Sequence, residues 1–451
     1  MGSSKRGGGQ ARTLPVQLLC LSAAFVVLWS TVCWGDADKI YKENGPSVVV
    51  IVAIDREGRS MSQGSGFVVR EDGAVVTNYH VISRATDIKV KIGEKILDIE
   101  GVLYVDLDND LALLKLRGNR FPAVRVGDAD GLQIGQKIYV IGSPQGLENT
   151  ISEGILSGIR DLGSGRKILQ MTAPISPGSS GGPVFNEKGE VIGVATFLIE
   201  ANQNLNFALP VNLLAPGLSK KDVASPRDAC RVDFTETAAC YYHQGLAYGT
   251  LGEFERAADA FNRALNIDPG RFEVYVSLGL SYANLGRHEE AVNMLMEGLK
   301  IRPGEPALLK ALSAVYSEMG RYGEAIAALE KSIAIRGDDP AAYYGLATTY
   351  AQMGRYKDAV TAAKKAIELN PESGEFRGFL GYAYDKLSMP AEAAAAFKAG
   401  IRLDPDDPRM HFGLGKAYVS LGEKASALEE YKMLKKLDPE SAGELFGLIY
   451  R

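Results

Sequence analysis

The chain has 451 residues, which is too long for one ordinary domain and suggests about three units. Its formal net charge is −5, and acidic and basic residues are interspersed, so nothing favours a nucleic-acid-binding surface. The hydrophobic fraction of 46% is that of a globular protein. The sequence has no phosphate-binding loop, no dinucleotide motif and no Cys/His metal spacing, so we expect no cofactor and no metal.

Residues 1–37 have the features of an export signal. Three basic residues, the last of them Arg12, precede an apolar stretch from about Leu14 to Trp34. Positive residues followed by such a stretch describe a signal peptide. The stretch is about 20 residues long, so an uncleaved segment could also span a bilayer, with the rest of the chain outside. Either way we expect a periplasmic or extracytoplasmic protein, with membrane contact only if the segment stays uncleaved.

Residues 39–215 contain short β-branched runs separated by glycine, asparagine and aspartate. Many short strands with frequent turn signals predict an all-β barrel or sandwich. The clearest runs are 47–52, 66–69, 74–76, 137–141 and 190–194.

Three residues of this β-rich region fit the parts of a serine nucleophile site. A serine hydroxyl is a poor nucleophile at neutral pH, so it needs a base, a group that orients the base, and donors for the oxyanion that forms. His80, Asp110 and Ser180 supply the base, the orienting acid and the nucleophile in that chain order. The glycines around Ser180 let backbone amides approach a developing negative charge. The sequence therefore predicts a serine protease, and a double barrel would let the triad bridge its two halves.

The segments that carry these residues resemble the protease domain of the HtrA/DegP family, which are trypsin-like serine endopeptidases with two β-barrels. The resemblance is co-linear over roughly residues 39–215. It implies that His80 is the general base, Asp110 its orienting partner and Ser180 the nucleophile. It also implies an oxyanion hole from the N–H groups of Gly178 and Ser180, and a site that must be ordered before it works. The similar segments are GSGFVVREDGAVVTNYHVI (64–82), DNDLALLKL (108–116), IGSPQGLENTISEGILSGI (141–159) and SPGSSGGPVFNEKGEVIGV (176–194).

Two other interpretations of these motifs fail on position. Gly178–Gly182 also fits the nucleophile elbow of α/β-hydrolases, but that fold needs its histidine after the serine, and the later histidines all lie in a helical region. Asp106–Asp110 resembles the start of an EF-hand loop. Leu111 stands where that loop needs glycine, and Arg117 where it needs glutamate, so we expect no calcium there.

Residues 216–237 are predicted to be a linker, because the strand pattern is lost between Pro210 and Pro226. Cys230 and Cys240 lie at the entry to the helical region that follows. An exported compartment permits a disulfide between them, but two unpaired thiols explain their spacing equally well. Neither is expected to be a nucleophile, since no partner base stands in a matching context.

From residue 238 onward the pattern becomes a helical repeat of about 34 residues, the period of tetratricopeptide (TPR) repeats. Small residues let paired helices approach, large ones fill the gap between them, and prolines separate the units. The third copy departs from the frame, with Gly337 in place of proline. Six repeats are predicted to begin near 238, 272, 306, 340, 374 and 408, with a closing helix over 441–450.

TPR arrays are scaffolds that hold peptides or protein partners in a concave groove, and the resemblance implies the same role here. Packing between helices is the alternative for each aromatic residue of the array. The array stands where PDZ domains follow the protease in the usual HtrA arrangement, so PDZ-based substrate capture is not expected. The sequence leaves open whether the protein forms a homo-oligomer. The residues expected to face the groove are Tyr242, Tyr344, Tyr382, Phe412 and Lys416.

Together these features predict an exported HtrA-like serine endopeptidase that hydrolyses unfolded or partner-presented proteins. The TPR domain, residues 238–451, would recruit a protein partner or regulate the protease. The alternative function is a non-proteolytic or latent scaffold or chaperone that acts through the TPR array alone. The intact triad favours the protease, because a retired enzyme would have little reason to keep all three residues.

Overall fold

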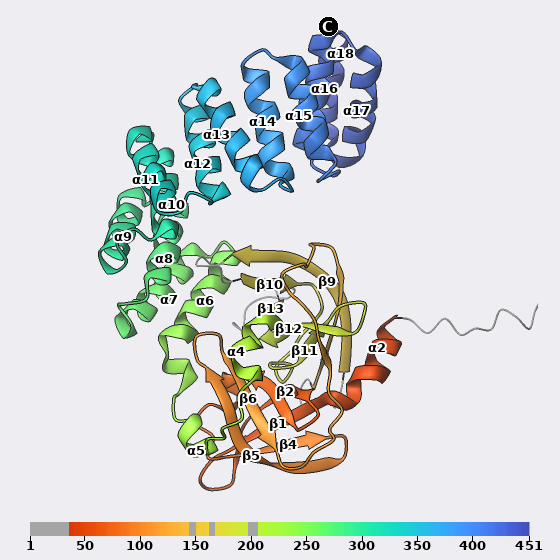
Figure 1. Ribbon diagram of the computed structural model, residues 1–451, viewed down its shortest axis with the longest axis vertical. Coiled ribbons are helices and arrows are strands. Elements are labelled where there is room, and N and C mark those ends of the chain that lie inside the picture. Colours follow the sequence, from red (N-terminus) through yellow and green to blue (C-terminus); the bar gives the residue numbers. More distant parts are fainter. Residues whose placement is uncertain (1–35, 144–149, 162–166, 197–205, 451) are drawn as a thin grey trace, which may run out of the picture.

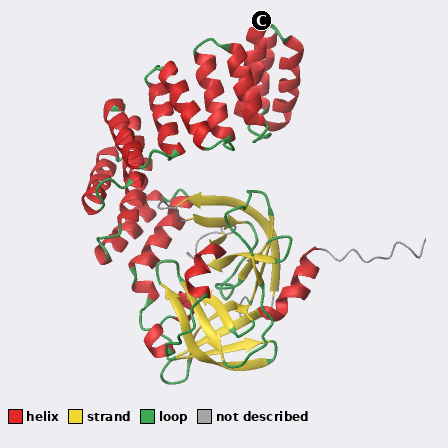
Figure 2. Ribbon diagram, in the orientation of Figure 1, coloured by secondary structure: helices red, strands yellow, loops and turns green. Residues whose placement is uncertain are grey.

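The computed structural model describes residues 36–143, 150–161, 167–196 and 206–450. Two β-barrels are followed by a curved array of helices, which leaves the barrels beside α6 and arches over them (Figures 1 and 2). This arrangement confirms the predicted fold class, an all-β double barrel followed by an all-α repeat array. The predicted export segment lies outside the described residues except for its last two, which begin helix α2. No helix of the described residues is long and apolar enough to cross a membrane.

The first barrel consists of six antiparallel strands in the closed order β1-β2-β3-β6-β5-β4. Strand β1 closes it, because Val50 pairs with Ser65 of β2 on one side and with Lys91 of β4 on the other. The one-turn helix α3 (Tyr79–Ile82) follows β3 directly, and α2 (Asp36–Asn44) and the 3₁₀ turn η2 (Gly45–Ser47) precede the barrel. The strands are β1 (Val48–Ile54), β2 (Ser60–Arg70), β3 (Ala74–Asn78), β4 (Asp87–Ile92), β5 (Lys95–Asp106) and β6 (Leu111–Leu116).

The second barrel has the strand order β11-β8-β9-β10-β13-β12, and pairing between β11 and β12 closes it. The short strand β7 adds to β12 in parallel. The strands are β7 (Arg125–Val126), β8 (Lys137–Gly142), β9 (Thr150–Asp161), β10 (Lys167–Met171), β11 (Pro183–Phe185), β12 (Glu190–Thr196) and β13 (Asn206–Pro210).

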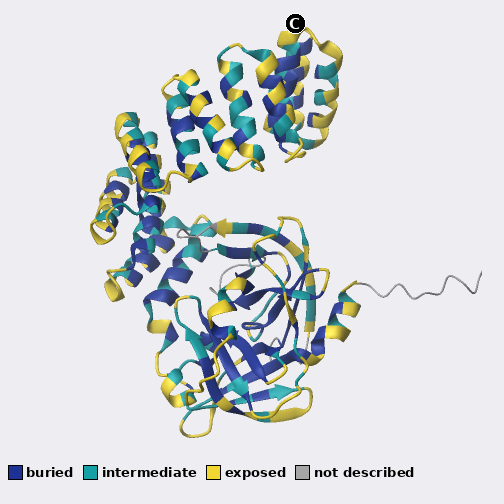
Figure 3. Cartoon of the chain, in the orientation of Figure 1, coloured by how far each residue is buried: buried dark blue, intermediate teal, exposed yellow. Residues whose placement is uncertain are grey.

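Several barrel strands, among them β1, β3, β6, β8 and β12, are buried along almost their whole length, and they appear as dark ribbons in Figure 3. In β8, Ile138 and Val140 pack inside the second barrel. The alternate residues Tyr139 and Ile141 belong to another cluster, which includes Phe67 of the first barrel. Successive side chains of a strand point to opposite faces, so burial on both sides explains the unbroken apolar runs of the sequence. The contact between the barrels is thus a core of its own.

Six helix pairs and a final helix form the array, and the first helices begin at the residues where the sequence period places the repeats. The frame of small and large residues follows from close packing within each pair. A Cβ at Gly245 would lie 2.5 Å from the ring of Phe261, and one at Gly279 would lie 2.7 Å from Leu295. The helices are α6 (Ala238–Thr250), α7 (Phe254–Ile267), α8 (Phe272–Asn284), α9 (His288–Ile301), α10 (Pro306–Glu318), α11 (Tyr322–Ile335), α12 (Pro340–Gln352), α13 (Tyr356–Leu369), α14 (Gly374–Lys386), α15 (Pro390–Ile401), α16 (Pro408–Leu421), α17 (Lys424–Leu437) and α18 (Pro439–Ile449).

The connecting segment, residues 211–237, is folded against the first barrel and is not the free linker that its composition indicates. The backbones of Val102 in β5 and Ala224 exchange two hydrogen bonds of 2.9 Å. Arg70 donates to the carbonyl of Leu218 at 2.6 Å. These contacts join residues more than a hundred positions apart, so no local sequence pattern announces them. The short helices of the segment are η4 (Val211–Leu214), α4 (Ala215–Leu218), α5 (Pro226–Ala229) and η5 (Phe234–Glu236).

Candidate active site

His80 and Asp110 are in contact at one end of the first barrel. His80 is the second residue of α3, and Asp110 immediately precedes β6, which pairs with β3. One carboxylate oxygen, Oδ1, accepts from the backbone N–H of His80 at 2.8 Å, and the other, Oδ2, lies 2.6 Å from ring Nδ1. Both oxygens of the acid thus bind the same histidine, one through its backbone and one through its ring.

The backbone of Asp110 is held in an uncommon conformation. Its φ of +50° lies in the left-handed region, which residues other than glycine rarely adopt. Its carbonyl accepts from Asn78 Nδ2 at 2.9 Å and from the Tyr79 N–H at 3.1 Å, and Asp110 is only 1% exposed. Strain of about 1–3 kcal/mol persists where the surroundings over-determine a conformation, and such residues cluster at functional sites. Here the surroundings aim the carboxylate at the histidine.

The environment of His80 prepares the ring to act as a base. Burial lowers the pKa of His80, but the charge of Asp110 and its hydrogen bond outweigh burial and hold that pKa above its ordinary value. An ionised carboxylate only accepts hydrogen bonds, so the proton of the neutral ring lies on Nδ1. Nε2 is therefore left with its lone pair, which is the requirement for accepting a proton.

Ser180 comes from the loop between β10 and β11 of the second barrel, and this loop is pressed against the first barrel. The carbonyl of Ser180 accepts from the N–H of Ser65 in β2 at 2.8 Å. The next residue, Gly181, has a φ of +85°, and a Cβ there would lie 2.2 Å from the Ser65 carbonyl oxygen and 2.4 Å from Thr77 Oγ1. Only glycine permits so close an approach. Ser180 is thus held at the junction of the two barrels.

Gly64 stands between the Ser180 loop and helix α3. A Cβ at Gly64 would lie 2.6 Å from a methyl group of Val81 and 3.1 Å from the carbonyl oxygen of Ser180. The residue after His80 and the backbone of Ser180 therefore meet across this glycine. Among the described residues, the ring of His80 bonds to Asp110 and not to Ser180. Such hydrogen bonds commonly tighten only when substrate binds.

The turn before Ser180 presents two backbone amides. The Ser179 N–H donates to the carbonyl of Ser176 at 2.9 Å, and Gly178, with a φ of +99°, occupies the third position of this turn. Ser65 Oγ holds the Gly178 carbonyl at 2.7 Å. Within the described ranges, the N–H groups of Gly178 and Ser180 donate to no protein acceptor. Amides of this kind can hold a developing oxyanion.

Two residues that support this site were missed by sequence reasoning. Ser65, which is fully buried, joins the loops by accepting from the Ser143 N–H at 2.9 Å and donating to Gly178. Asn78, also fully buried, fixes the carbonyl of Asp110. The only sequence signal for Asn78 is its place two residues before the histidine, and nothing marks Ser65 among the many serines.

The other sequence candidates near the barrels have structural roles. Asp106 binds Asn109 through both of its oxygens, at 3.0 Å and 2.7 Å, as in an ordinary turn. No group of three His, Cys, Asp or Glu side chains among the described residues could hold a metal ion. Cys230 and Cys240 are free and buried, so the thiol alternative holds and not the disulfide. Burial raises the pKa of Cys230 to about 12, which leaves it unreactive at neutral pH.

A second candidate site is an aromatic cavity of about 380 Å³ between α12, α14, α15 and α16. Four of the five residues predicted to face the groove line it: Tyr344, Tyr382, Phe412 and Lys416. Phe379, which sequence reasoning missed, meets the ring of Tyr344 edge-on at 5.4 Å and lies tilted against the ring of Tyr382 at 6.0 Å between ring centroids. Lys416 pairs with Asp385 at 2.7 Å, and Arg409 with Asp407 at 2.7 Å. The cavity therefore offers rings with balanced charge.

Tyr242, the fifth predicted groove residue, does not face a groove. It is fully buried, with its ring 5.9 Å from that of Phe261 and with Arg271 stacked over it at 5.4 Å. The prediction is wrong for this residue because its side chain lies in the core between the helices of the first two repeats, where Arg271 covers its ring. Tyr242 packs between helices, which was the alternative for every aromatic of the array.

Comparison with known families agrees with the division into barrels and repeats. Residues 64–194 match the model of the trypsin-like peptidase domain. This segment contains His80, Asp110 and Ser180. The chain carries a trypsin-like serine protease domain. Tetratricopeptide repeat models match the helical array at residues 238–271, 272–305, 316–381 and 380–442.

The relatives of this trypsin-like domain are HtrA- and DegP-type proteins. HhoB of Synechocystis sp. is 40% identical over 161 residues, which are 34% of this chain and 38% of HhoB. A Pseudomonas putida protein named as a periplasmic DegP-like serine endoprotease is 36% identical over 165 residues, 35% of each chain. The crystal structure of Deg5 is similar over 40% of this chain and 91% of Deg5, with 33% identity and a TM-score of 0.35. The chain thus spans little more than a third of the two relatives' lengths, and the similarity concerns the protease domain.

Proposed function

We propose that the protein is an exported serine endopeptidase of the HtrA type, whose substrates are unfolded or partner-presented proteins. The observation that carries the proposal is the double contact of Asp110 with His80, which fixes the ring with Nε2 as its basic atom. Export is supported by the basic and apolar pattern of residues 1–37 and by the periplasmic name of the DegP-like relative.

The proposed reaction begins with attack of Ser180 Oγ on the peptide carbonyl carbon. His80 Nε2 takes the hydroxyl proton, the amides of Gly178 and Ser180 hold the oxyanion, and Asp110 stabilises the imidazolium that forms. Collapse of this intermediate breaks the C–N bond, and His80 returns the proton to the leaving amine. Water, deprotonated by His80, then cleaves the acyl-enzyme and restores the serine. The steps need no metal or cofactor.

The proposed role of the TPR array is to bind a protein partner or substrate segment through the aromatic cavity. Its rings provide an apolar surface, and its paired charges leave no strong preference for either sign. The cavity therefore suits a peptide with an apolar or mixed side-chain pattern. Aromatic residues in concave sites contribute much of the energy at protein interfaces.

Labelling with a fluorophosphonate probe tests the proposal, together with degradation of casein. The full chain should label and cleave, Ser180→Ala should do neither, and Ser179→Ala, with the adjacent serine removed, should do both. Absence of labelling in the unmodified protein would contradict an assembled triad. Intact partner binding by that unlabelled protein would then support the scaffold function.

A further inference from the structure

The helix that carries His80 is too short to be stable by itself and depends on its surroundings. Helix α3 has four residues, and no side chain caps its N-terminus. Nucleation of a single turn is unfavourable, so tertiary contacts must hold it. Asp110 holds one side through the His80 N–H. The opposite contacts come from the connecting segment that leads to the TPR array.

The connecting segment is hydrogen-bonded to both ends of α3. At the start of the helix, Tyr79 donates its hydroxyl to the carbonyl of Val232 at 3.2 Å. Just after its end, Ser83 Oγ donates to the same carbonyl at 2.9 Å and accepts from the Phe234 N–H at 3.0 Å. The N–H of Arg84 donates to the Cys230 carbonyl at 2.6 Å. Hydrogen bonds from residues 230–234 therefore hold both ends of helix α3 in place.

The ring of Phe234 lies beside the ring of His80, on the side that faces the TPR array. It is 4% exposed, and its centroid lies 6.2 Å from the ring of His80 and 6.2 Å from the ring of Tyr79. On its other side it lies 6.5 Å from the ring of His243 in α6. The phenylalanine thus stands between the proposed base and the first helix of the TPR array. An apolar wall at this place limits both the ring's movement and the access of water to it.

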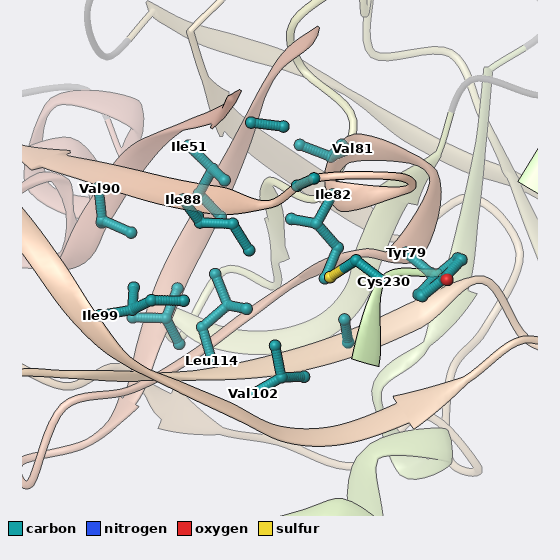
Figure 4. Packing of buried hydrophobic residues seen from close by; sticks show 14 of the residues in the cluster. Ile51, Tyr79, Val81, Ile82, Ile88, Val90, Ile99, Val102, Leu114 and Cys230 are labelled. Atoms are coloured by element: carbon teal, nitrogen blue, oxygen red, sulfur yellow. The ribbon is translucent and has the colours of Figure 1, made fainter. Parts of the chain in front are cut away.

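The first repeat is joined to the first barrel through a shared core. Ala239 and Cys240 of α6 belong to the same buried cluster as Tyr79 and Ile82 of α3. Figure 4 shows Cys230 of the connecting segment in this cluster, with its sulfur beside Ile82. The first repeat therefore cannot shift relative to the barrel without disturbing the residues packed under the histidine.

The second repeat reaches the loop of the acid. Arg271, at the start of α8 and 9% exposed, donates to Asp108 Oδ1 at 2.7 Å. Asp108 lies two residues before Asp110. The same guanidinium stacks over the ring of Tyr242, which explains why this tyrosine is buried. The base and the acid are thus each supported from the TPR side, by Phe234 and by Arg271.

We infer that Phe234 and Arg271 are positioning residues for His80 and Asp110, so that the connecting segment and the start of the TPR array are structural parts of the catalytic site. This inference rests on the proposed protease function. It makes the array more than a detachable recruiting module, because any ligand that shifts the first two repeats also shifts the support of the base and the acid. Ligand binding can change an equilibrium of this kind when it favours one arrangement of the repeats.

The test compares full-length variants by hydrolysis of a small chromogenic peptide, normalised to the number of sites titrated by the fluorophosphonate. The peptide is too small to require the aromatic cavity. Phe234→Ala and Arg271→Gln should each lower kcat, by up to about 100-fold, because a displacement of about 1 Å costs this much. KM should change by less than about two-fold, since binding of the peptide is not altered. Phe234→Leu should recover most of the loss by restoring an apolar wall.

Matched controls separate positioning from general damage to the array. Phe376→Ala removes another buried ring, 8% exposed, from the fifth repeat, and Arg355→Gln removes an arginine that pairs with Asp358 in the fourth. Both should keep the unmodified kcat per titrated site. Arg271→Gln keeps a polar side chain at this buried position and removes an ion pair whose acidic partner, Asp108, is 66% exposed, so the variant should stay folded. It decides the matter if Phe234→Ala does not fold.

The outcomes distinguish this inference from the function on which it rests. An unmodified protein that neither labels nor hydrolyses the peptide contradicts the protease function and the inference together. An active protein whose Phe234→Ala and Arg271→Gln forms keep kcat per titrated site contradicts the inference alone. A fall in the titrated fraction with unchanged kcat would show a purely structural role and would also overturn it.

Discussion

The first and last repeats of the TPR array have the same sequence frame but different neighbours. Ala239 and Cys240 of the first repeat lie in the core of the first barrel. Leu414 and Leu445 of the last helices lie in a core of their own, next to the open aromatic cavity. One end of the array is thus buried against the first barrel, and the other contains the cavity that we propose as a binding site. A continuous repeat pattern does not imply a uniform role along the array.

The largest expected effect is loss of peptide hydrolysis without loss of peptide binding at the aromatic cavity. Ser180→Ala should lower kcat/KM for a small peptide by about 10⁶-fold, because the nucleophile is lost while the rest of the site remains. Peptides selected from a displayed random library on the aromatic cavity should bind this variant with unchanged affinity, as measured by calorimetry. A loss of that binding would mean that the aromatic cavity in the last repeats also depends on the protease site. The two ends of the array would then not differ as described.

A smaller effect is expected from the acid that supports the base. Asp110→Asn should lower kcat by about 10⁴-fold, because the ring is no longer held in the required tautomer. The charge of Asp110 raises the pKa of His80, so in the unmodified protein kcat/KM is lost as the pH falls through this raised pKa. The midpoint of that acidic limb should lie above the ordinary histidine value, and it should move to lower pH in the variant.

The pH–rate profile also tests whether repeats far from the barrels influence His80. Arg355→Gln, in the fourth repeat, should leave the acidic midpoint in place. A midpoint that stays unchanged in Asp110→Asn would contradict the assignment of this titration to His80.

Two left-handed glycines give a matched test of local packing. Gly181→Ala would place a methyl group 2.2 Å from a carbonyl oxygen, and we expect a loss of about 2–5 kcal/mol in stability together with loss of labelling. Gly252, in the turn of the first repeat, has a φ of +75° and nothing within 4 Å of a Cβ, so Gly252→Ala should cost only about 1–2 kcal/mol. Thermal unfolding followed by circular dichroism measures both. Equal shifts in the two variants would show that the contact at the junction of the barrels is not tight.

The smallest effect is expected at the aromatic cavity. Phe412→Ala should weaken binding of a selected peptide by about 10-fold, because it removes one ring from an apolar wall. Hydrolysis of a small peptide that does not occupy the cavity should stay unchanged. Phe446→Ala removes a ring that is 44% exposed on α18, outside the cavity, and serves as the control. Equal weakening by both variants would place the binding surface elsewhere.

Local patterns in the sequence were sufficient to predict the proposed catalytic residues and the repeat frame. The motifs around His80, Asp110 and Ser180 are contiguous, and their order along the chain excludes the α/β-hydrolase alternative. The close contact between Gly245 and Phe261 is repeated between Gly279 and Leu295 and between Gly381 and Phe397, so it leaves a period that can be counted. In the first case each residue lies in a short motif of its own, and in the second the same residue types return at a fixed spacing.

Contacts between distant parts of the chain could not be predicted from local sequence patterns. The hydrogen bond between Tyr79 and Val232 joins residues 153 positions apart, and that between Asp108 and Arg271 joins residues 163 positions apart. Neither pair belongs to a periodic pattern. The sequence therefore indicated a linker where the structure has a packed segment, and a groove residue at Tyr242 where it has a core residue.

The sequence by itself indicated an all-β barrel or sandwich with a predicted serine triad, followed by a TPR array, and its resemblance to HtrA/DegP proteases implied that the barrel is double. Short-range residue chemistry and a fixed period are sufficient for the strand-rich region, the triad order and the repeats. Only the tertiary structure decided which end of the array is buried, that Cys230 and Cys240 remain free, and that Phe234 lies against His80. These features depend on which surfaces meet when the barrel and the first repeat fold together, and burial of apolar surface acts without regard to distance along the chain.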